Sequence, residues 1–233
     1  MKLPWWLSIF RWLAIDVYRF IKGPRKVHLY GVYMYNGKNG AGKTIGLTEK
    51  LIRLRKKYGD KIYICTNYGF ELEDFPLTHW KQLLQKYDKS IVFAYDEVQN
   101  DFNSRDYKNF PFELIRVLTQ NRKGNGIQIL MSAPKFNEVD KSIRDLVFRV
   151  CQCRKAWFGR VTKVRDYDIE DYEMYINEID VVKKRKIPCR KYQFIQTDEI
   201  RNAYDTLAYI NSAKDKEYVS SSEKLASILG DLI

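Results

Sequence analysis

The 233-residue sequence predicts a three-layer α/β fold around a mainly parallel central sheet. Short apolar runs rich in Val, Ile and Tyr alternate with segments whose apolar residues recur at helical spacing, a pattern typical of strand–helix–strand units. Residues 90–97, SIVFAYDE, are apolar enough for a parallel strand that is buried on both faces. A glycine-rich segment follows the first strand-like run and precedes a helix-like one, which places it at a strand-to-helix turn.

The N-terminal segment, residues 1–24, is expected to form an amphipathic helix outside the α/β core. Three tryptophans fall within eight of its residues, and charges interrupt its apolar run at Arg11, Asp16 and Arg19. Those charges make it a poor membrane span, whereas tryptophans beside Lys and Arg suit a helix that lies in a membrane interface through residues 5–21. Packing on its own domain or on a neighbouring subunit explains the segment equally well.

The core is expected to span residues 25–165 and to contain the alternating elements. Its patterns predict strands at 27–37, 61–67, 90–97 and 126–134, and helices at 44–58, 78–87 and 111–121. Thr78 is a candidate cap for the second of these helices, and Pro111 stands at the first position of the third.

Basic residues accumulate toward the end of this core. Two strand-like runs flank Phe158–Gly159 and predict an antiparallel hairpin, which we expect to form a basic C-terminal extension. Residues 141–165 hold eight Lys or Arg and one acid, while residues 166–233 are assigned to a further extension and tail. The candidate nucleic-acid contacts are Arg154, Lys155, Arg160 and Lys163.

The overall charge favours an acidic partner. The chain has 41 Lys and Arg against 29 Asp and Glu, a formal net charge of +12. Such a balance favours nucleic acid or an acidic membrane surface, although a generally basic composition explains it too.

The four cysteines show no metal-site spacing with the two distant histidines. We therefore expect buried free thiols in a reducing compartment, and a cytoplasmic location.

The glycine-rich segment matches the phosphate-binding pattern GxxxxGK[ST]. Glycines let backbone amides turn inward around an anion, and the N-terminus of the following helix adds partial positive charge. The last lysine is expected to reach the β- and γ-phosphates of ATP, and the last threonine to offer its hydroxyl to Mg²⁺. The predicted nucleotide-binding residues are Gly37, Lys38, Asn39, Gly40, Ala41, Gly42, Lys43 and Thr44.

Two adjacent carboxylates, Asp96 and Glu97, end the predicted strand at 90–97. The first is expected to hold Mg²⁺ together with Thr44, and the second to polarise the attacking water for in-line hydrolysis. Lys43 and Glu97 are therefore the predicted catalytic residues of a nucleotide hydrolase.

Hydrolysis of this kind usually needs an additional positive charge near the transition state, often an arginine from a neighbouring subunit. Four arginines are candidates, and composition alone does not choose among them: Arg105, Arg116, Arg122 and Arg144.

Several segments resemble the zonular occludens toxin-like ATPases, which belong to the FtsK–HerA superfamily of DNA-pumping motors. The resemblance covers roughly residues 27–210. It is carried by the loop GKNGAGKT, the strand SIVFAYDEVQN, the segment LTQNRKGNGIQILMSAP and the later EIRNAYDTLAYI.

This resemblance implies a ring, with a hexamer favoured, that binds ATP at subunit junctions and acts on viral or mobile-element DNA. It implies phage assembly proteins as partners and a place at the cytoplasmic face of the host inner membrane. Arg122 matches the arginine of this superfamily that acts on a neighbour's site. Two departures are that Ser132–Ala133–Pro134 replaces the usual polar sensor, and that no membrane span follows the ATPase domain.

The function that these observations favour is an ATP-hydrolysing oligomeric motor for DNA translocation in virion assembly, extrusion or packaging. One alternative is a membrane-associated ATPase for protein coat assembly or secretion. Another is a nucleotide-dependent switch without DNA pumping. A small-molecule kinase is less favoured, because no acceptor pocket or arginine-bearing lid is identified.

Overall fold

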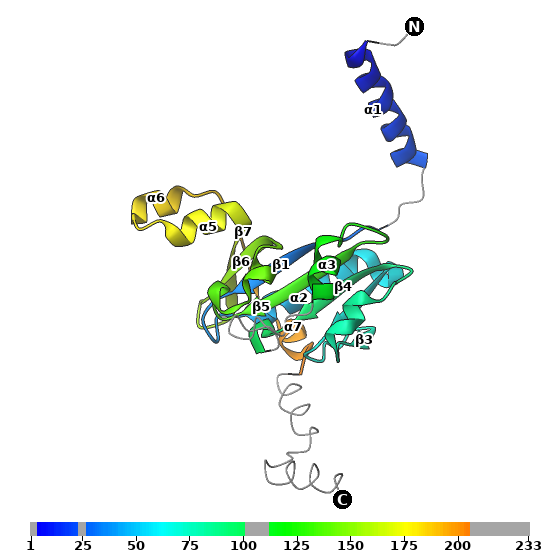
Figure 1. The fold of residues 1–233 in the computed structure, drawn as a ribbon. Helices are drawn as coiled ribbons and strands as arrows, with labels where there is room; N and C mark the ends of the chain where they lie inside the picture. Colours follow the sequence, from blue (N-terminus) through cyan, green and yellow to red (C-terminus); the bar gives the residue numbers. More distant parts are fainter. Residues whose placement is uncertain (1–3, 23–26, 101–111, 206–233) are drawn as a thin grey trace, which may run out of the picture.

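A computed structural model describes residues 4–22, 27–100 and 112–205. Its centre is an eight-stranded sheet in the order β3-β2-β4-β5-β1-β6-β7-β8 (Figure 1). The strands from β3 to β6 in this order pair in parallel, whereas β6, β7 and β8 pair in antiparallel fashion. The predicted α/β class with a mainly parallel sheet is therefore confirmed.

The strands are β1 (Gly31–Asn36), β2 (Ile62–Thr66), β3 (Phe75–Pro76), β4 (Ser90–Tyr95), β5 (Ile127–Ala133), β6 (Val147–Ala156), β7 (Val161–Asp168) and β8 (Arg190–Ile195). The α-helices are α1 (Trp5–Lys22), α2 (Lys43–Tyr58), α3 (Phe112–Thr119), α4 (Lys141–Arg144), α5 (Ile169–Asn177), α6 (Val181–Lys186) and α7 (Asp198–Asn202). Short 3-10 helices are η1 (Gly59–Lys61), η2 (Trp80–Leu84), η3 (Val98–Asn100) and η5 (Phe136–Glu138).

Two apolar clusters cover the two faces of the sheet and make the three layers. On one face, α2 and α7 pack against β-strand residues such as Tyr35 and Val164. On the other face, α3, α4 and α5 pack against residues such as Met34 and Phe93. Successive residues of a strand point to opposite faces, so each central strand contributes to both clusters.

The predicted helix at 78–87 is wrong. Only the 3-10 helix η2 forms there, and its cap is the His79 side chain, which accepts a hydrogen bond from the amide of Lys81 at 3.1 Å. The carbonyl oxygen of the Gln82 side chain accepts hydrogen bonds from the backbone amides of Thr78 and His79. These bonds stabilise a tight turn in place of the predicted helix. Leu83 is the one residue of η2 that is buried, so the segment has no apolar stripe to support a longer helix.

The boundaries of other elements differ by smaller amounts. β1 begins at Gly31 rather than at residue 27, and β4 ends at Tyr95, so that Asp96 and Glu97 follow the strand. α3 begins at Phe112, and Pro111 lies outside the described residues.

The predicted hairpin forms, but it continues the central sheet rather than extending from it. Its first strand, β6, pairs in parallel with β1, and its second, β7, runs across residue 165, the expected end of the core. β8 then adds to β7 from the segment that was assigned to the C-terminal extension.

The N-terminal helix also forms, over Trp5–Lys22, and Figure 1 shows it standing apart from the sheet. Most of its apolar side chains are exposed, including Trp5 at 76% and Phe10 at 66%. In residues 4–22, 27–100 and 112–205, no helix is sufficiently long and apolar to cross a membrane.

Candidate nucleotide site

The glycine-rich loop connects β1 to α2 at the edge of the sheet where the parallel strands end. Two of its positions require glycine. A Cβ atom on Gly37 would lie 2.7 Å from the carbonyl oxygen of Cys153. Gly42 has a φ of 92°, a left-handed conformation that favours glycine, and a Cβ atom there would lie 3.0 Å from the Thr162 hydroxyl. The loop is therefore held against the β6–β7 hairpin by two close approaches of its backbone.

The N-terminus of α2 has the features of an anion-binding site. Lys43 is only 7% exposed, and in the described part of the chain its ammonium forms no ion pair. No side chain caps the helix at Gly42, so the first amides of α2 remain available. A buried, unpaired charge is costly, and a phosphate at the helix N-terminus would supply both the missing charge and the missing acceptors.

Asp96 lies beneath this loop in a network of hydrogen bonds. The Thr44 hydroxyl donates to its carboxylate at 2.8 Å, and the Ser132 hydroxyl donates to the other carboxylate oxygen. The side-chain amide of Asn67 fixes its backbone through bonds of 2.7 and 3.0 Å. Burial raises the pKa of Asp96, and the hydrogen bonds from Ser132 and Thr44 oppose that rise.

The residues present fit a magnesium ion. Mg²⁺ binds through one or two carboxylates together with phosphate oxygens and water, and the touching oxygens of Thr44 and Asp96 offer such a donor set. A cation would also offset the burial of the Asp96 charge. Among the described residues, no group of three or more His, Cys, Asp and Glu could hold a metal by itself.

Glu97 follows Asp96 with an unusual backbone. Its φ is 55°, a left-handed conformation that costs energy for a residue with a side chain. Its amide donates to the Ser132 hydroxyl at 3.0 Å, and the Asn100 amide donates to its carboxylate at 3.1 Å. These contacts hold an exposed carboxylate beside Asp96.

Sequence reasoning overlooked Asn67 and understated Ser132. Both come at or next to the ends of strands, β2 and β5, that flank β4 in the sheet. Because the ends of neighbouring parallel strands meet at one edge, that position was the signal that could have found Asn67. In the sequence, Ser132 belongs only to the segment that replaces the usual polar sensor, whereas the structure places its hydroxyl between the Asp96 carboxylate and the Glu97 amide.

One of the candidate arginines, Arg122, lies away from this loop. Arg122 precedes β5, where its guanidinium lies 4.9 Å from the centre of the Tyr30 ring and its carbonyl is 2.9 Å from His28 Nε2. Because the loop follows the parallel strand β1, the seven-residue β5 separates Arg122 from the loop edge by about 23 Å. Arg122 therefore does not reach the phosphate loop of its own chain.

For the other three candidate arginines, the described part of the chain shows no contact that indicates a role at the nucleotide site. Arg144 bonds to the Val139 carbonyl at 3.1 Å and to the Asn137 side chain at 3.3 Å. Arg116 is exposed on α3, and Arg105 lies outside the described residues.

Three of the four predicted nucleic-acid residues lie beside the loop. Arg154, Lys155 and Lys163 line a pocket of about 710 Å³ that they share with loop residues 37–41. The fourth, Arg160, is engaged elsewhere, since it forms an ion pair with Asp198 at 2.8 Å.

Three of the four thiols are buried, as expected. Cys65, Cys151 and Cys153 are buried and free, and Cys189 is half-buried and free. Burial raises the pKa of Cys65 and of Cys153 to about 12, which keeps both thiols protonated and unreactive.

Comparison with solved structures finds the N-terminal domain of zonular occludens toxin from Neisseria meningitidis, with a TM-score of 0.52 and 16% identity over 76% of this chain and 100% of that chain. The genome packaging NTPase B204 from Sulfolobus turreted icosahedral virus 2, in complex with ATP-gammaS, has a TM-score of 0.47 and 9% identity. That match covers 70% of this chain and 96% of that chain. The ATPase domain of G40P has a TM-score of 0.48 and 8% identity, and the match covers 83% of this chain and 97% of that chain. No protein-family model and no curated protein matches the chain.

The sheet order, the glycine loop and the Thr44–Asp96 contact together define the class: the chain has the architecture of a P-loop nucleoside triphosphatase. Within that class, it shares the fold of the zonular occludens toxin N-terminal domain, which confirms the fold that the sequence resemblance implies.

Proposed function

We propose that this protein is an ATPase that works as an oligomeric motor, coupling ATP turnover to DNA translocation in virion assembly, extrusion or packaging. The observation that supports ATP hydrolysis is the hydrogen-bonded chain at the loop edge of the sheet. Thr44, Asp96 and Ser132 are linked there, and Ser132 accepts from the backbone amide of Glu97.

The residues of this edge have complementary roles. Bound ATP with Mg²⁺ would supply the phosphoanhydride bond and the cation that neutralises its developing charge. The loop amides and Lys43 would bind the phosphates, while Thr44 and Asp96 would hold the cation. Glu97 would orient and polarise the attacking water, since its carboxylate is exposed beside Asp96.

DNA is the proposed substrate of the motor because basic side chains adjoin the phosphate loop. The chain carries a net charge of +12, and Arg154, Lys155 and Lys163 share a pocket with the loop. A nucleic-acid backbone there would be attracted by charge, and its binding would be felt directly at the nucleotide site.

An oligomer is proposed because Arg122 lies at the edge of the sheet opposite the loop. In a ring, with a hexamer favoured, this edge of one subunit would supply Arg122 to the nucleotide site of the next. The exposed aromatic residues of α1 support a place on a membrane surface, where phage assembly proteins would be its partners.

The experiment compares phosphate release by the purified oligomer with and without DNA. We expect Lys43→Ala and Glu97→Gln each to lower the rate at least about 100-fold, with ATP binding retained in Glu97→Gln. Lys61→Ala, a matched change at an exposed lysine of η1, should leave the rate unchanged. DNA should raise the wild-type rate.

The outcomes separate the alternatives. Hydrolysis without any binding of DNA or response to it would reject the DNA motor and favour an ATPase for coat assembly or secretion. In a single turnover, ATP that stays intact for many minutes would reject hydrolysis and indicate a nucleotide-dependent switch.

A further inference from the structure

One face of the β6–β7–β8 segment carries a regular group of cations. The pairing register places Gln152, Arg165 and Lys191 in one row across the three strands, and Arg154, Lys163 and Gln193 in the next. Side chains two residues apart on a strand share a face, so the two rows lie about 7 Å apart on one surface. We call these six residues the basic face.

The charges of the basic face are not balanced by neighbouring acids. Arg154 lies directly opposite Lys163, and Arg165 directly opposite Lys191. Like charges in that position are destabilising, and none of these four forms an ion pair with a described residue. Other arginines of the same hairpin are paired: Arg149 with Asp166 at 2.7 Å, and Arg160 with Asp198.

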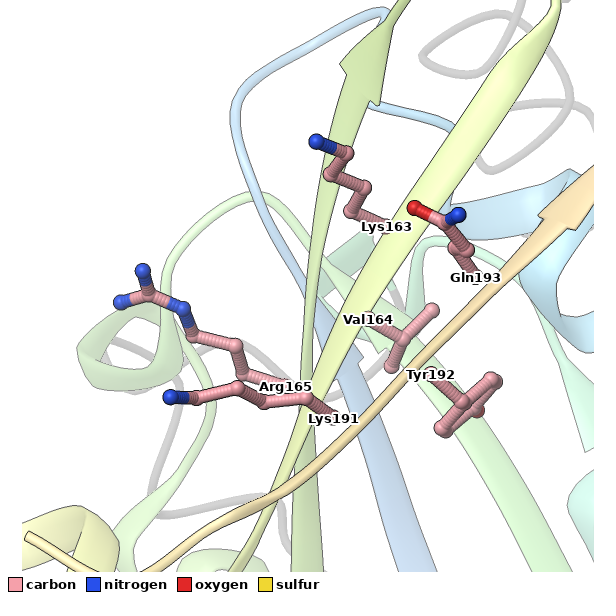
Figure 2. Close-up of a pocket in the computed structure, with 6 residues that line it drawn as sticks. All are labelled: Lys163, Val164, Arg165, Lys191, Tyr192 and Gln193. Carbon is pink, nitrogen blue, oxygen red and sulfur yellow. The ribbon is translucent and has the colours of Figure 1, made fainter.

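The basic face is open, whereas the reverse side of the same strands is covered. Cys153 and Val164 point to the reverse side and are buried in the cluster that includes α2. Figure 2 shows Lys163, Arg165 and Lys191 extending to one side of the strands, and Val164 and Tyr192 to the other. A hollow of about 350 Å³ lies among the three cations, and the pocket beside the phosphate loop adjoins it through Lys163 and Arg165.

The turn between β6 and β7 presents two aromatic side chains at the tip of the hairpin. Trp157 is 72% exposed and Phe158 is fully exposed. Both have a φ of 50°, a conformation that costs energy outside glycine. Two large apolar groups are thus held in water on a strained turn, about 10 Å along the strand from Arg154.

We infer that the basic face and the Trp157–Phe158 turn together bind a single strand of nucleic acid. Its phosphates would lie along Lys191, Arg165, Lys163 and Arg154, and its bases would stack on the turn. Cations that follow a backbone and aromatic rings that accept any base are the combination used for single strands, while paired bases in a duplex are not free to stack. This assignment rests on the proposed DNA motor, and it places the strand against the phosphate loop through the shared pocket.

The test measures the binding of a fluorescent oligothymidylate by anisotropy, without nucleotide, over a series of salt concentrations. Charge reversal by Lys191→Glu or Arg165→Glu should weaken binding at least about tenfold at low salt, and each lost phosphate contact should lower the log–log salt slope by about 0.7. Trp157→Ala and Phe158→Ala should each weaken binding by about fivefold to a hundredfold. Lys61→Glu, with the same charge change on η1, should have no such effect.

Two control measurements separate a loss of nucleic-acid binding from general damage to the protein. ATP binding by Lys191→Glu should stay at the wild-type level, because Lys191 lines the hollow and not the pocket at the loop. Lys191→Gln, which removes the charge without reversing it, should give a smaller loss of the same kind.

Equal binding by Lys191→Glu, Arg165→Glu and Lys61→Glu would overturn the assignment, as would tighter binding of a duplex than of the single strand. Because the binding is measured without hydrolysis, a failure of the ATPase would appear separately, as unchanged phosphate release in Lys43→Ala.

Discussion

At the scale of the residue, Ser132 organises the two carboxylates. Its hydroxyl donates to Asp96 and accepts from the amide of Glu97, so one oxygen fixes both the carboxylate proposed to bind the metal and the backbone of the residue proposed to activate water. The residue is completely buried, which removes competition from water for these bonds. The geometry of the site therefore depends on a side chain that need not touch the nucleotide.

Replacing Ser132 by alanine should lower kcat about 10- to 100-fold, the usual effect of losing a partner that orients a metal ligand. The binding of ATP measured without Mg²⁺ should change little, because the loop and Lys43 are intact. Steady-state kinetics and a binding titration check the two parts.

Ser90→Ala is the matched control for that variant. Ser90 is a buried serine at the other end of the same region of the sheet, where it bonds to the backbone of Leu29 and Gly126. Its loss should lower the melting temperature without lowering kcat. Equal kcat values in the two variants would show that Ser132 has no special role.

At the scale of the element, α1 has the composition expected of an interfacial helix. Its exposed aromatic and aliphatic side chains come with Arg19 and Lys22 in its last turn, and no described helix can cross a membrane. A helix of this kind binds a bilayer by inserting its apolar side chains near the headgroups, and anionic lipid strengthens the attachment.

We expect the protein to float with vesicles that contain anionic lipid, and Trp5→Ala/Trp6→Ala/Trp12→Ala to stay in the soluble fraction. Trp157→Ala, which removes an equally exposed tryptophan from the hairpin turn, should float like the wild type. Flotation of the triple variant would instead place the membrane contact elsewhere.

The sequence predicts best those elements whose own residues bury a regular apolar pattern. α2, β2, β4 and β5 are near their predicted bounds because each contributes several buried residues. β8 was not predicted, because its residues alternate between exposed and half-buried and its position depends on pairing with β7. The misread segment at 78–87 has a local cause: the Gln82 side chain accepts hydrogen bonds from the amides of Thr78 and His79, and η2 has only one buried residue.

The candidate site divides in the same way. The loop and Asp96–Glu97 are local patterns that can be read directly. The roles of Asn67 and Ser132 come from two other strands of the sheet and need the strand order before they can be recognised.

At the scale of the whole molecule, the sheet separates two parts of one proposed catalytic site. The loop lies where β1 ends, and Arg122 lies where β5 begins, so a subunit cannot bring its own Arg122 to its own loop. In the proposed ring, the neighbouring subunit would complete each site by supplying its Arg122.

Mixing two inactive variants tests that arrangement. Lys43→Ala retains Arg122, and Arg122→Ala retains the loop, so random mixed rings should regain about a quarter of the intact junctions. ATPase activity should therefore reappear on mixing after subunit exchange. No activity in the mixture, or a fully active Arg122→Ala, would contradict a role for Arg122 across the junction.

The sheet order has a consequence for how copies of this protein can meet. In the described residues its outer strands are β3, which has two residues and includes Pro76, and β8, which presents Arg190 and Lys191. Brevity, proline and repulsive charge are the means by which proteins prevent strands of separate molecules from joining edge to edge. Assembly should therefore proceed by contact between folded surfaces, and the protein should stay soluble and resist fibril formation when its subunits are dispersed.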